Sequence, residues 1–188
     1  MAMAFLETER LLIRPWENKD AVPLAKMCAN PQVMRYFPSV LSQEESEALR
    51  QRVQSLIEEN GWGFWAVELK ATGQFIGFVG LHAQDLAIPN TPFVEIGWRL
   101  DAEHWGKGYA PEAAQRALQY AFESLDAPDV YAFTTVTNLP SQRVMQKLGM
   151  TDCEQNFLHP KLPADHVLAE HCLYRITRAE WQQKKRNL

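Results

Sequence analysis

The clearest hydrophobic pattern in the chain is a stripe of small and apolar residues at helical spacing. Each residue of the stripe has another three or four positions away: Ala110, Ala113, Ala114, Ala117, Leu118, Ala121, Phe122 and Leu125. Such spacing is typical of one face of an α-helix. Because most of the side chains in the stripe are short, we predict a long helix that packs closely against a sheet.

Two shorter helical patterns precede this stripe. Asp20 begins a segment whose apolar face is formed by Leu24, Met27 and Cys28. Ser42 and Glu45 then stand at the spacing of a capping box, in which each side chain accepts a hydrogen bond from the other residue's backbone N–H. We predict that the helix opened by this box ends at Gly61. Its apolar face is formed by Leu49, Val53, Leu56 and Ile57.

Segments of strand character lie between and after these helices. One neighbouring pair is separated by a loop with Gly73, which can adopt the positive φ of a short hairpin turn. Two more helices are expected, over Ser141–Leu148 and after a second capping box at Thr177. The predicted strands are Arg10–Trp16, Trp62–Leu69, Gln74–Leu81, Phe93–Leu100, Val130–Val136, Met150–Leu158 and His171–Ile176.

The order of these elements predicts an α/β fold of the mixed α+β kind, in which helices flank a mixed sheet of about seven strands. No repeat, charge block or linker-like stretch interrupts the 188 residues. We therefore expect a single domain over residues 1–188.

Composition narrows the class of protein. Hydrophobic residues make up 46% and charged residues 22% of the chain, as in soluble globular proteins. The net charge of −4 argues against nucleic acid or an anionic membrane as a partner. The strongly apolar stretch Phe75–Leu81 is far too short to span a bilayer, and the first ten residues lack the pattern of a secretory signal.

Cysteine and histidine usage indicates a cytoplasmic protein without a metal. The three cysteines, Cys28, Cys153 and Cys172, form no C-x-x-C pair, which favours free thiols in a reducing compartment. The histidines of the last third of the chain, at 159, 166 and 171, stand at intervals that match no zinc pattern.

The segment most informative about function is a glycine loop between the strand Phe93–Leu100 and the long helix. A loop that enters a helix presents unpaired backbone N–H groups, and the helix dipole adds positive charge there. Gly106 and Gly108 bring no side chains that would keep a diphosphate away, and Lys107 adds a mobile cation. A dinucleotide fingerprint fails because Pro111 stands where glycine is required, and a Walker loop fails on spacing. A plain strand-to-helix turn remains the alternative.

A second segment, Asn138–Met150, adds evidence that the glycine loop alone does not give. Together the two segments resemble the GNAT superfamily of acetyl-CoA-dependent N-acetyltransferases, whose motifs read [Q/R]-x-x-G-x-[G/A] and N-x-x-A-x-x-x-Y-x-K-x-G-[F/M]. The chain as a whole is similar to the branch that includes the ribosomal-protein alanine N-acetyltransferases. The matching positions are Gly108, Ala110, Asn138, Lys147, Gly149 and Met150.

The resemblance implies a fold and a cofactor site. It implies a mostly antiparallel sheet that is splayed between the strands at 93–100 and 130–136, with acetyl-CoA as co-substrate and no metal. The backbones of Trp98 and Leu100 would lie beside the pantetheine arm, and Asn138 would bond to it unless its amide only caps a helix. The implied cofactor-binding residues are Trp98, Leu100, Trp105, Gly106, Lys107, Gly108, Tyr109, Ala110, Asn138, Ser141 and Lys147.

Two positions depart from the family motifs. Trp105 stands at the Gln/Arg position, which this branch often accepts. Met145 stands where many members carry a general-acid tyrosine, and a thioether cannot donate a proton to a leaving thiolate. Ser141, one turn into its helix, is then the candidate acid, with an ordinary first-turn serine or water as the alternatives.

Glu95 is the candidate base, because it is a carboxylate in an otherwise apolar strand. Burial would raise its pKa into a useful range, whereas pairing with Arg99 on the same face would lower it. Water is the alternative base. The sequence leaves this choice open.

The predicted function is transfer of an acetyl group from acetyl-CoA to a primary amine by direct attack. The acceptor is a protein N-terminus or a small amine, and a small amine would be enclosed by the helix from Ser42 and the loop from 157 to 166. A catalytically silent acyl-CoA-binding regulatory module is the rival hypothesis. The oligomeric state stays open, with a homodimer as one expectation.

Overall fold

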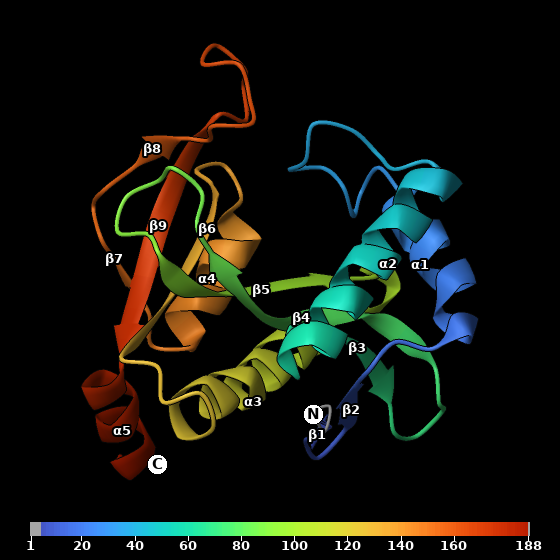
Figure 1. Cartoon of the computed structure of the whole chain (residues 1–188), viewed down its shortest axis with the longest axis horizontal. Coiled ribbons are helices and arrows are strands. Elements are labelled where there is room, and N and C mark those ends of the chain that lie inside the picture. Colours follow the sequence, from blue (N-terminus) through green and yellow to red (C-terminus); the bar gives the residue numbers. More distant parts are fainter. Residues whose placement is uncertain (1–4, 188) are drawn as a thin grey trace. The chain divides into compact units, whose positions relative to one another are not determined.

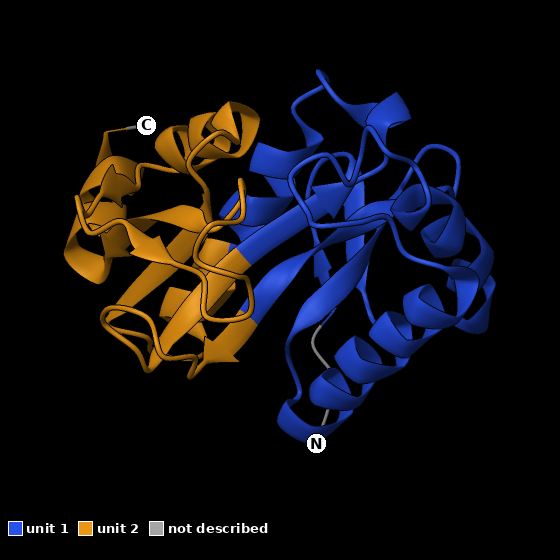
Figure 2. Cartoon of the chain, turned by 90° about the horizontal axis from the view of Figure 1, so that it is seen from above, with its two compact units in different colours: residues 1–81, 97–117 blue, residues 82–96, 118–188 orange. Residues whose placement is uncertain are grey.

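The computed structural model describes residues 5–187. The chain divides into two compact units, each made of two separate segments, as Figure 2 shows. Unit 1 consists of residues 1–81 and 97–117, and unit 2 consists of residues 82–96 and 118–188. The two units interleave along the chain, and the single domain over 1–188 stays a prediction.

Unit 1 contains four antiparallel strands in sequence order and the helices that pack on them (Figure 1). In the β2–β3 pair Leu11 lies opposite Leu69, and in the β3–β4 pair Phe64 lies opposite Gly80. Helices α1 and α2 pack side by side. The elements are β1 (Leu6–Glu7), β2 (Leu11–Arg14), the 3-10 helix η1 (Asn18–Asp20), α1 (Ala21–Cys28), α2 (Gln43–Asn60), β3 (Phe64–Leu69), most of β4 (Phe75–Gln84) and the 3-10 helix η2 (Ala102–His104).

Helix α2 confirms the capping box and the stop signal. The backbone N–H of Glu45 donates to Oγ of Ser42 at 3.1 Å, and the N–H of Ser42 donates to Oε1 of Glu45 at 2.9 Å. At the other end Gly61 has φ 81°, a left-handed conformation that glycine adopts without steric cost. The predicted apolar face is buried at Val53 and Ile57.

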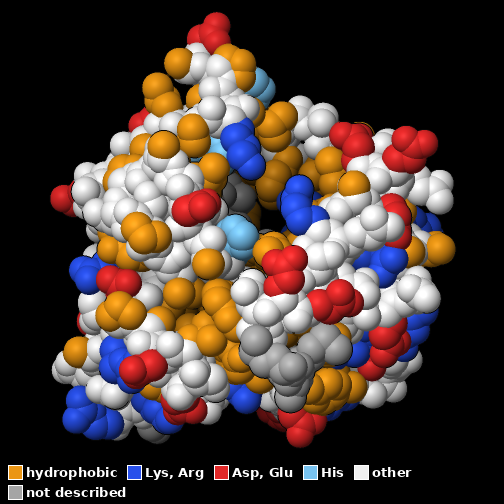
Figure 3. Space-filling model, viewed as in Figure 1, with side chains coloured by type: hydrophobic (Ala, Val, Ile, Leu, Met, Phe, Trp, Pro, Cys, Tyr) orange, Lys and Arg blue, Asp and Glu red, His pale blue; other side chains and the backbone are white. Residues whose placement is uncertain are grey.

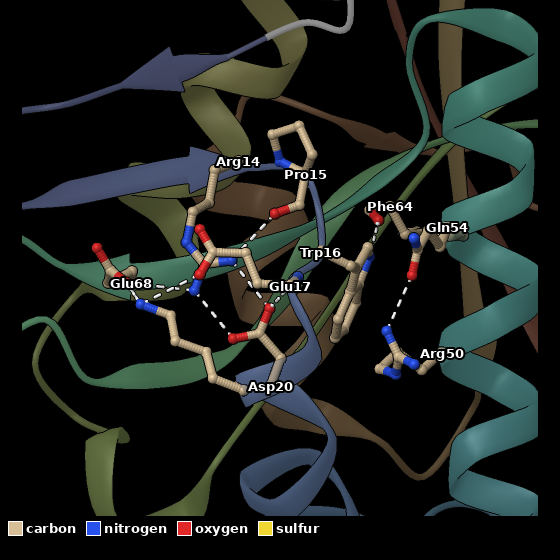
Figure 4. Close-up of polar contacts among 10 residues, drawn as sticks. Arg14, Pro15, Trp16, Glu17, Asp20, Arg50, Gln54, Phe64 and Glu68 are labelled. Carbon is tan, nitrogen blue, oxygen red and sulfur yellow. Dashed lines mark hydrogen bonds and ion pairs between the residues drawn. The ribbon is translucent and has the colours of Figure 1, made fainter.

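A buried ion pair joins α1 to the sheet of unit 1 (Figure 4). The guanidinium of Arg14 donates two hydrogen bonds of 2.9 Å to the carboxylate of Asp20, and Arg14 also lies 3.2 Å from Oε1 of Glu68. Arg14 is 4% and Asp20 0% exposed. The arrangement places η1 and α1 against β2 and β3, because a buried charge is stable only with such partners.

Strands β4 and β5 approach each other closely at one glycine of unit 1. A Cβ at Gly77 would lie 2.2 Å from the carbonyl oxygen of Arg99. Beside this point, the N–H of Asp101 donates to the carbonyl of Ile76 at 2.8 Å. No other residue type fits at position 77, and the close contact fixes the end of β5 from which the glycine loop begins.

Unit 2 is built around β9 and β6, which pair antiparallel from Asp129↔Thr177 to Thr135↔His171. Strands β5 and β6 run parallel, with Glu95 opposite Tyr131. Ile88, Phe93, Tyr131 and Leu173 form a hydrophobic core in this unit. The elements are β5 (Phe93–Leu100), α3 (Tyr109–Glu123), β6 (Asp129–Thr135), α4 (Leu139–Lys147), β7 (Thr151–Asp152), β8 (Phe157–Leu158), β9 (Glu170–Thr177) and α5 (Arg178–Arg186), of which β5 and α3 continue into unit 1.

The predicted fold class is confirmed. The described residues form a mostly antiparallel sheet of nine strands in the order β1-β2-β3-β4-β5-β6-β9-β7, with β8 also paired to β9, together with five α-helices. The sequence did not predict the short strand β1, because two residues are too few to show a periodic pattern. The splay between β5 and β6 stays a prediction.

Several element boundaries were wrong, among them the end of β4, which extends to Gln84 and not only to Leu81. The predicted strand Met150–Leu158 is two strands of two residues each, because the chain turns between them at Glu154, whose φ is 55° and whose N–H donates to the carboxylate of Asp152. Helix α4 begins at Leu139, not at Ser141, because Asn138 is its N-cap.

Candidate active site

The glycine loop lies where the sequence placed it, between β5 and α3. Gly106 and Gly108 have φ values of 74° and 79°, a left-handed conformation that L side chains rarely adopt. Within the described residues, no acceptor is bonded to the backbone N–H groups of residues 106–110. Five unpaired donors at the N-terminus of a helix of 15 residues are a ready anion site.

The residues of and beside the loop differ in their contacts and exposure. The indole N–H of Trp105 donates to the carbonyl of Leu100 at 3.0 Å, while the ring stays 43% exposed. Tyr109 and Ala110 are half-buried at the start of α3, and Lys107 is exposed and forms no ion pair with a described residue. The side chain of Lys107 is therefore available to an anion at the loop.

A clamp that sequence reasoning missed supports the first turn of α3. Oγ of Thr8 donates to Glu112 at 2.5 Å, and Nε of Arg10 donates to the same carboxylate at 2.7 Å. The guanidinium of Arg10 also lies 4.4 Å from the centre of the Tyr109 ring. Burial acts to raise the pKa of Glu112, but the hydrogen bonds from Thr8 and Arg10 outweigh it, so the pKa is lowered and Glu112 stays ionised. The sequence offered one signal for this contact, namely that Glu112 is an acidic residue in the first turn of the helix.

On β5, Glu95 has a defined polar partner. The amide Nε2 of Gln84 donates to Oε1 of Glu95 at 3.3 Å. The amide oxygen of Gln84 accepts from the N–H groups of Asp85 and Leu86, at 3.1 and 3.0 Å, which fixes the direction of its NH2 group. Sequence reasoning missed Gln84, because it placed the end of that strand at Leu81.

The electrostatics of Glu95 decide between the two predicted outcomes. Burial raises the pKa of Glu95 to about 7, and the hydrogen bond from Gln84 opposes the rise. A carboxyl group with a pKa near 7 suits a general base at neutral pH. Of the two alternatives that the sequence left open, the structure favours burial, since Glu95 forms no ion pair with Arg99 among the described residues.

The other predicted residues of β5 differ in exposure. Trp98 is half-buried and Leu100 is 6% exposed. The guanidinium of Arg99 contacts the rings of Phe37 and Phe78, and its Nη1 lies 3.7 Å from Sγ of Cys28. The role of the Trp98 and Leu100 backbones beside a pantetheine arm stays a prediction.

Helix α4 carries the second group of predicted residues. Oδ1 of Asn138 accepts from the N–H of Ser141 at 3.2 Å, and its Nδ2 donates to Thr134 at 3.0 Å. The amide of Asn138 therefore caps the helix, which leaves part of its hydrogen-bonding capacity for a ligand. Ser141 is half-buried, and its hydroxyl has no hydrogen bond with any residue in the described range.

Met145 and Lys147 of α4 face different surroundings. Met145 is 2% exposed and belongs to the core, so its side chain contributes packing rather than proton transfer. Lys147 is exposed, and its carbonyl oxygen accepts from the ammonium of Lys184. A cofactor role for Lys147 stays a prediction.

Two of the three C-terminal histidines lie together. The rings of His159 and His171 are 5.0 Å apart and pack against Phe133, while His171 also packs on Phe157. Burial lowers the pKa of both histidines. Among residues 5–187, no group of three His, Cys, Asp or Glu side chains could hold a metal ion.

The surface charge is mixed in sign. On the face drawn in Figure 3, Lys and Arg side chains are interspersed with Asp and Glu side chains. An anion site on this molecule therefore depends on local groups such as the glycine loop. None of the described helices is long and apolar enough to cross a membrane.

Comparison with known proteins identifies the family. Residues 10–151 match the model of the acetyltransferase (GNAT) domain. This chain is a GNAT acetyltransferase. A Bacillus subtilis (strain 168) protein named "Uncharacterized N-acetyltransferase YnaD" is 30% identical to it over 177 residues, which cover 94% of this chain and 98% of that protein. The family prediction is confirmed, and the enzyme is an acetyl-CoA-dependent N-acetyltransferase.

Other relatives of this GNAT acetyltransferase agree. "FsC-acetyl coenzyme A-N(2)-transacetylase" of Aspergillus fumigatus is 29% identical over 187 residues, 96% of this chain and 79% of that protein. A GNAT-family acetyltransferase from Bacillus anthracis has a TM-score of 0.77 at 28% identity and covers 93% of this chain and 98% of its own. A ribosomal-protein-S5-alanine acetyltransferase from Vibrio fischeri shares the fold, with a TM-score of 0.72 at 23% identity over 95% and 98% of the two chains. The solved structures that share the fold thus include a member of the predicted branch, the ribosomal-protein acetyltransferases.

Proposed function

We propose that this GNAT acetyltransferase transfers the acetyl group of acetyl-CoA to a primary amine by direct attack, with both reactants bound at once. The amine nitrogen forms a bond to the thioester carbonyl carbon, and the tetrahedral intermediate expels CoA as the thiolate. Binding both reactants converts a bimolecular step into an effectively unimolecular one. No covalent enzyme intermediate is required.

The glycine loop is the single observation that carries the cofactor assignment. The free N–H groups of residues 106–110, the N-terminus of α3 and the unpaired cation of Lys107 suit the diphosphate of acetyl-CoA. Arg10 adds a second positive charge, since its Nη2 would lie 3.4 Å from a Cβ at Gly108. The carbonyl of Leu100 already accepts a hydrogen bond from the Trp105 indole, and the pantetheine arm is expected beside the backbones of Trp98 and Leu100.

Glu95 is the proposed base. The incoming amine arrives mainly as an ammonium ion, and its proton passes to Glu95, directly or through water. The pKa of about 7 leaves a substantial fraction of this carboxylate ready to accept a proton at neutral pH. Gln84 positions the carboxylate through its hydrogen bond.

The departing thiolate needs a proton, and Ser141 or water supplies it. The free hydroxyl of Ser141 supports this assignment, whereas Met145 in the core has no proton to give. An N–H near Trp98 would stabilise the oxyanion of the tetrahedral intermediate. Asn138 and Lys147 are proposed as further contacts to the cofactor.

A single-turnover assay of CoA thiol release with a panel of small amines and peptide N-termini tests the proposal. We expect thiol release in equal amount to the acetylated amine, for at least one acceptor class. If calorimetry shows that acetyl-CoA binds but no amine releases thiol, the chain is the silent acyl-CoA-binding module that the loss of the tyrosine at position 145 would allow.

A further inference from the structure

The guanidinium of Arg99 has no anionic partner among residues 5–187. Its polar contact is the thiol of Cys28, 3.7 Å from Nη1, and its Nε is buried without a hydrogen-bond partner among the described residues. Other arginines of the chain do bridge carboxylates: Arg10, Arg14, Arg50, Arg175 and Arg178. Arg99 is therefore set apart from them by its surroundings.

Two aromatic rings contact this guanidinium. Its central carbon lies 4.2 Å from the centre of the Phe37 ring and 5.1 Å from that of Phe78. Cation–π contacts use the flat faces of a guanidinium, whereas its five N–H donors point outward in the plane. Nη1 donates to Cys28, and the remaining N–H donors form no hydrogen bond with a described residue, so they could bind a planar oxyanion.

The charges around Arg99 make the lack of an anion more costly. Burial lowers the pKa of Arg99, and the nearby guanidinium of Arg52 on α2 lowers it further, while Cys28 opposes the change. Burial in turn raises the pKa of the Cys28 thiol, which keeps it neutral at physiological pH. The charges of Arg99 and Arg52 thus have no ion-pair partner in the described part of the chain, a situation that a bound anion relieves.

The surroundings of Arg99 differ from those of the glycine loop. Cys28 belongs to α1, Arg52 to α2, and Phe37 to the segment that joins these two helices. Phe37 is 40% exposed, so the guanidinium lies beneath a surface side chain. The loop at residues 105–110 has its own cations, Lys107 and Arg10, for the phosphates of the cofactor.

We infer that Arg99, which contacts Phe37 and Phe78, binds the carboxylate of the acceptor, and that the acceptor is therefore an amine that also carries a carboxylate. The inference rests on the proposed acetyl transfer to a primary amine. The guanidinium fork matches a carboxylate with two parallel hydrogen bonds, which an ammonium group cannot reproduce. Free amino acids and peptides with an acidic side chain share this chemistry.

The test compares acceptors that differ only in the carboxylate. Rates of CoA release are measured at saturating acetyl-CoA for glycine, 4-aminobutyrate, glutamate and lysine, and for their carboxamides. Each rate is corrected for the fraction of free amine. A pair of peptides with aspartate or asparagine at the second position separates peptide acceptors from free amino acids. We expect carboxylates to exceed amides by about 10- to 100-fold in kcat/KM.

Variants assign this preference to Arg99. Arg99→Met keeps an apolar side chain beside the rings and should abolish the preference, while Arg99→Lys keeps the charge without the fork and should retain part of it. Arg175→Met is the matched control, because Arg175 also contacts a ring, that of Tyr131, but already pairs with Asp129 at 2.8 Å. This control should keep the full preference, and thermal unfolding of each variant checks that it is folded.

Three results would overturn the inference. If the wild-type enzyme acetylates the carboxamides as fast as the amino acids, it has no subsite for a carboxylate. A preference that survives Arg99→Met places it elsewhere. An equal loss of acetyl-CoA affinity in Arg99→Met, measured by calorimetry, would mean that the anion is a phosphate of the cofactor. If no acceptor is acetylated at all, acetyl transfer fails, and calorimetric titration of the same amino acids into wild type and Arg99→Met still decides whether Arg99 binds carboxylates.

Discussion

At the scale of single residues, Glu95 and Gln84 form the pair with the clearest chemical consequence. The backbone N–H groups of Asp85 and Leu86 hold the oxygen of Gln84, so its NH2 group can only point toward Glu95. Such an amide positions the carboxylate and stabilises its charged form. The basicity of Glu95 is thus set by burial on one side and by one neutral donor on the other.

The pH dependence of the reaction should report this pair. In wild type, kcat/KM should rise through about pH 7, and in Glu95→Gln this limb should disappear, because an amide cannot accept the proton. Gln84→Met should move the limb to higher pH by about 0.5–1 unit, because the charged form loses a hydrogen bond. Two amines of different pKa distinguish the enzyme's limb from titration of the acceptor.

The matched control is Gln119→Met. Gln119 donates to the carboxylate of Glu123 at 3.0 Å on an exposed face of α3, so the same chemical change there should leave the pH profile unmoved. A limb that follows the amine identically in wild type and Glu95→Gln would show that Glu95 is structural and that water is the base.

At the scale of elements, β5, the glycine loop and α3 form a strand-to-helix unit whose backbone is the proposed cofactor site. The clamp of Thr8 and Arg10 on Glu112 fixes the first turn of α3 to the edge of β2. The indole of Trp105 ties the loop to the end of β5. The N–H groups are therefore held in place before a ligand arrives, which lowers the entropic cost of binding.

A side chain in this loop should weaken the cofactor site. Gly108→Val should reduce acetyl-CoA affinity by about 100-fold or more, because a β-branched residue resists a φ of 79° and occupies the space of the diphosphate. Calorimetry measures the change. Gly73→Val is the control, since Gly73 has a φ of 73° with nothing within 4 Å of its added Cβ. The Gly73→Val variant should lose stability without losing affinity for acetyl-CoA. Unchanged affinity in a folded Gly108→Val variant would contradict the phosphate-loop assignment.

At the scale of the whole molecule, the half-buried carboxyl group of Glu95 links stability to pH. The pKa of Glu95 rises from an ordinary 4.5 to about 7 in the folded chain. Between these values the unfolded chain gives up the proton that the folded chain keeps. The stabilising contribution of protonated Glu95 is therefore complete below pH 4.5 and is lost as the pH rises through about 7.

Urea unfolding of wild type and Glu95→Gln at several pH values measures this linkage. The free energy of unfolding of wild type should fall relative to that of the variant by up to ~3 kcal/mol between pH 4.5 and pH 8.5. The difference between the two proteins removes the contribution of every other titrating group. A constant difference across this range would mean that Glu95 is ionised at all these pH values.

Local patterns made most of the architecture predictable. The capping boxes at Ser42 and Thr177, the stop at Gly61 and the strand Phe93–Leu100 all depend on neighbours in the sequence, and the structure contains each of them. The segment from 150 to 158 misled because its composition favours a strand while an Asx turn at Asp152 breaks it. The glycine loop was predictable for the same local reason.

The partners of the site residues were not predictable. Glu112 bonds to Thr8 and Arg10, about a hundred positions away in the chain, and the thiol that Arg99 contacts is 71 positions away. No periodicity encodes such pairs, because the tertiary fold alone brings them together. The direction of the pKa shift of Glu95 likewise depends on burial that the sequence could not supply.

The buried pair of Arg14 and Asp20 also determines how the protein should respond to salt. Dissolved ions screen charges that water can reach, such as the exposed pair of Lys19 and Glu17, but have little access to a pair that is 4% and 0% exposed. The attachment of α1 to its sheet should therefore hold over a wide range of ionic strength. Salt titrations of acetyl-CoA affinity then measure the contacts to phosphate, undisturbed by loosening of the helix that carries Cys28.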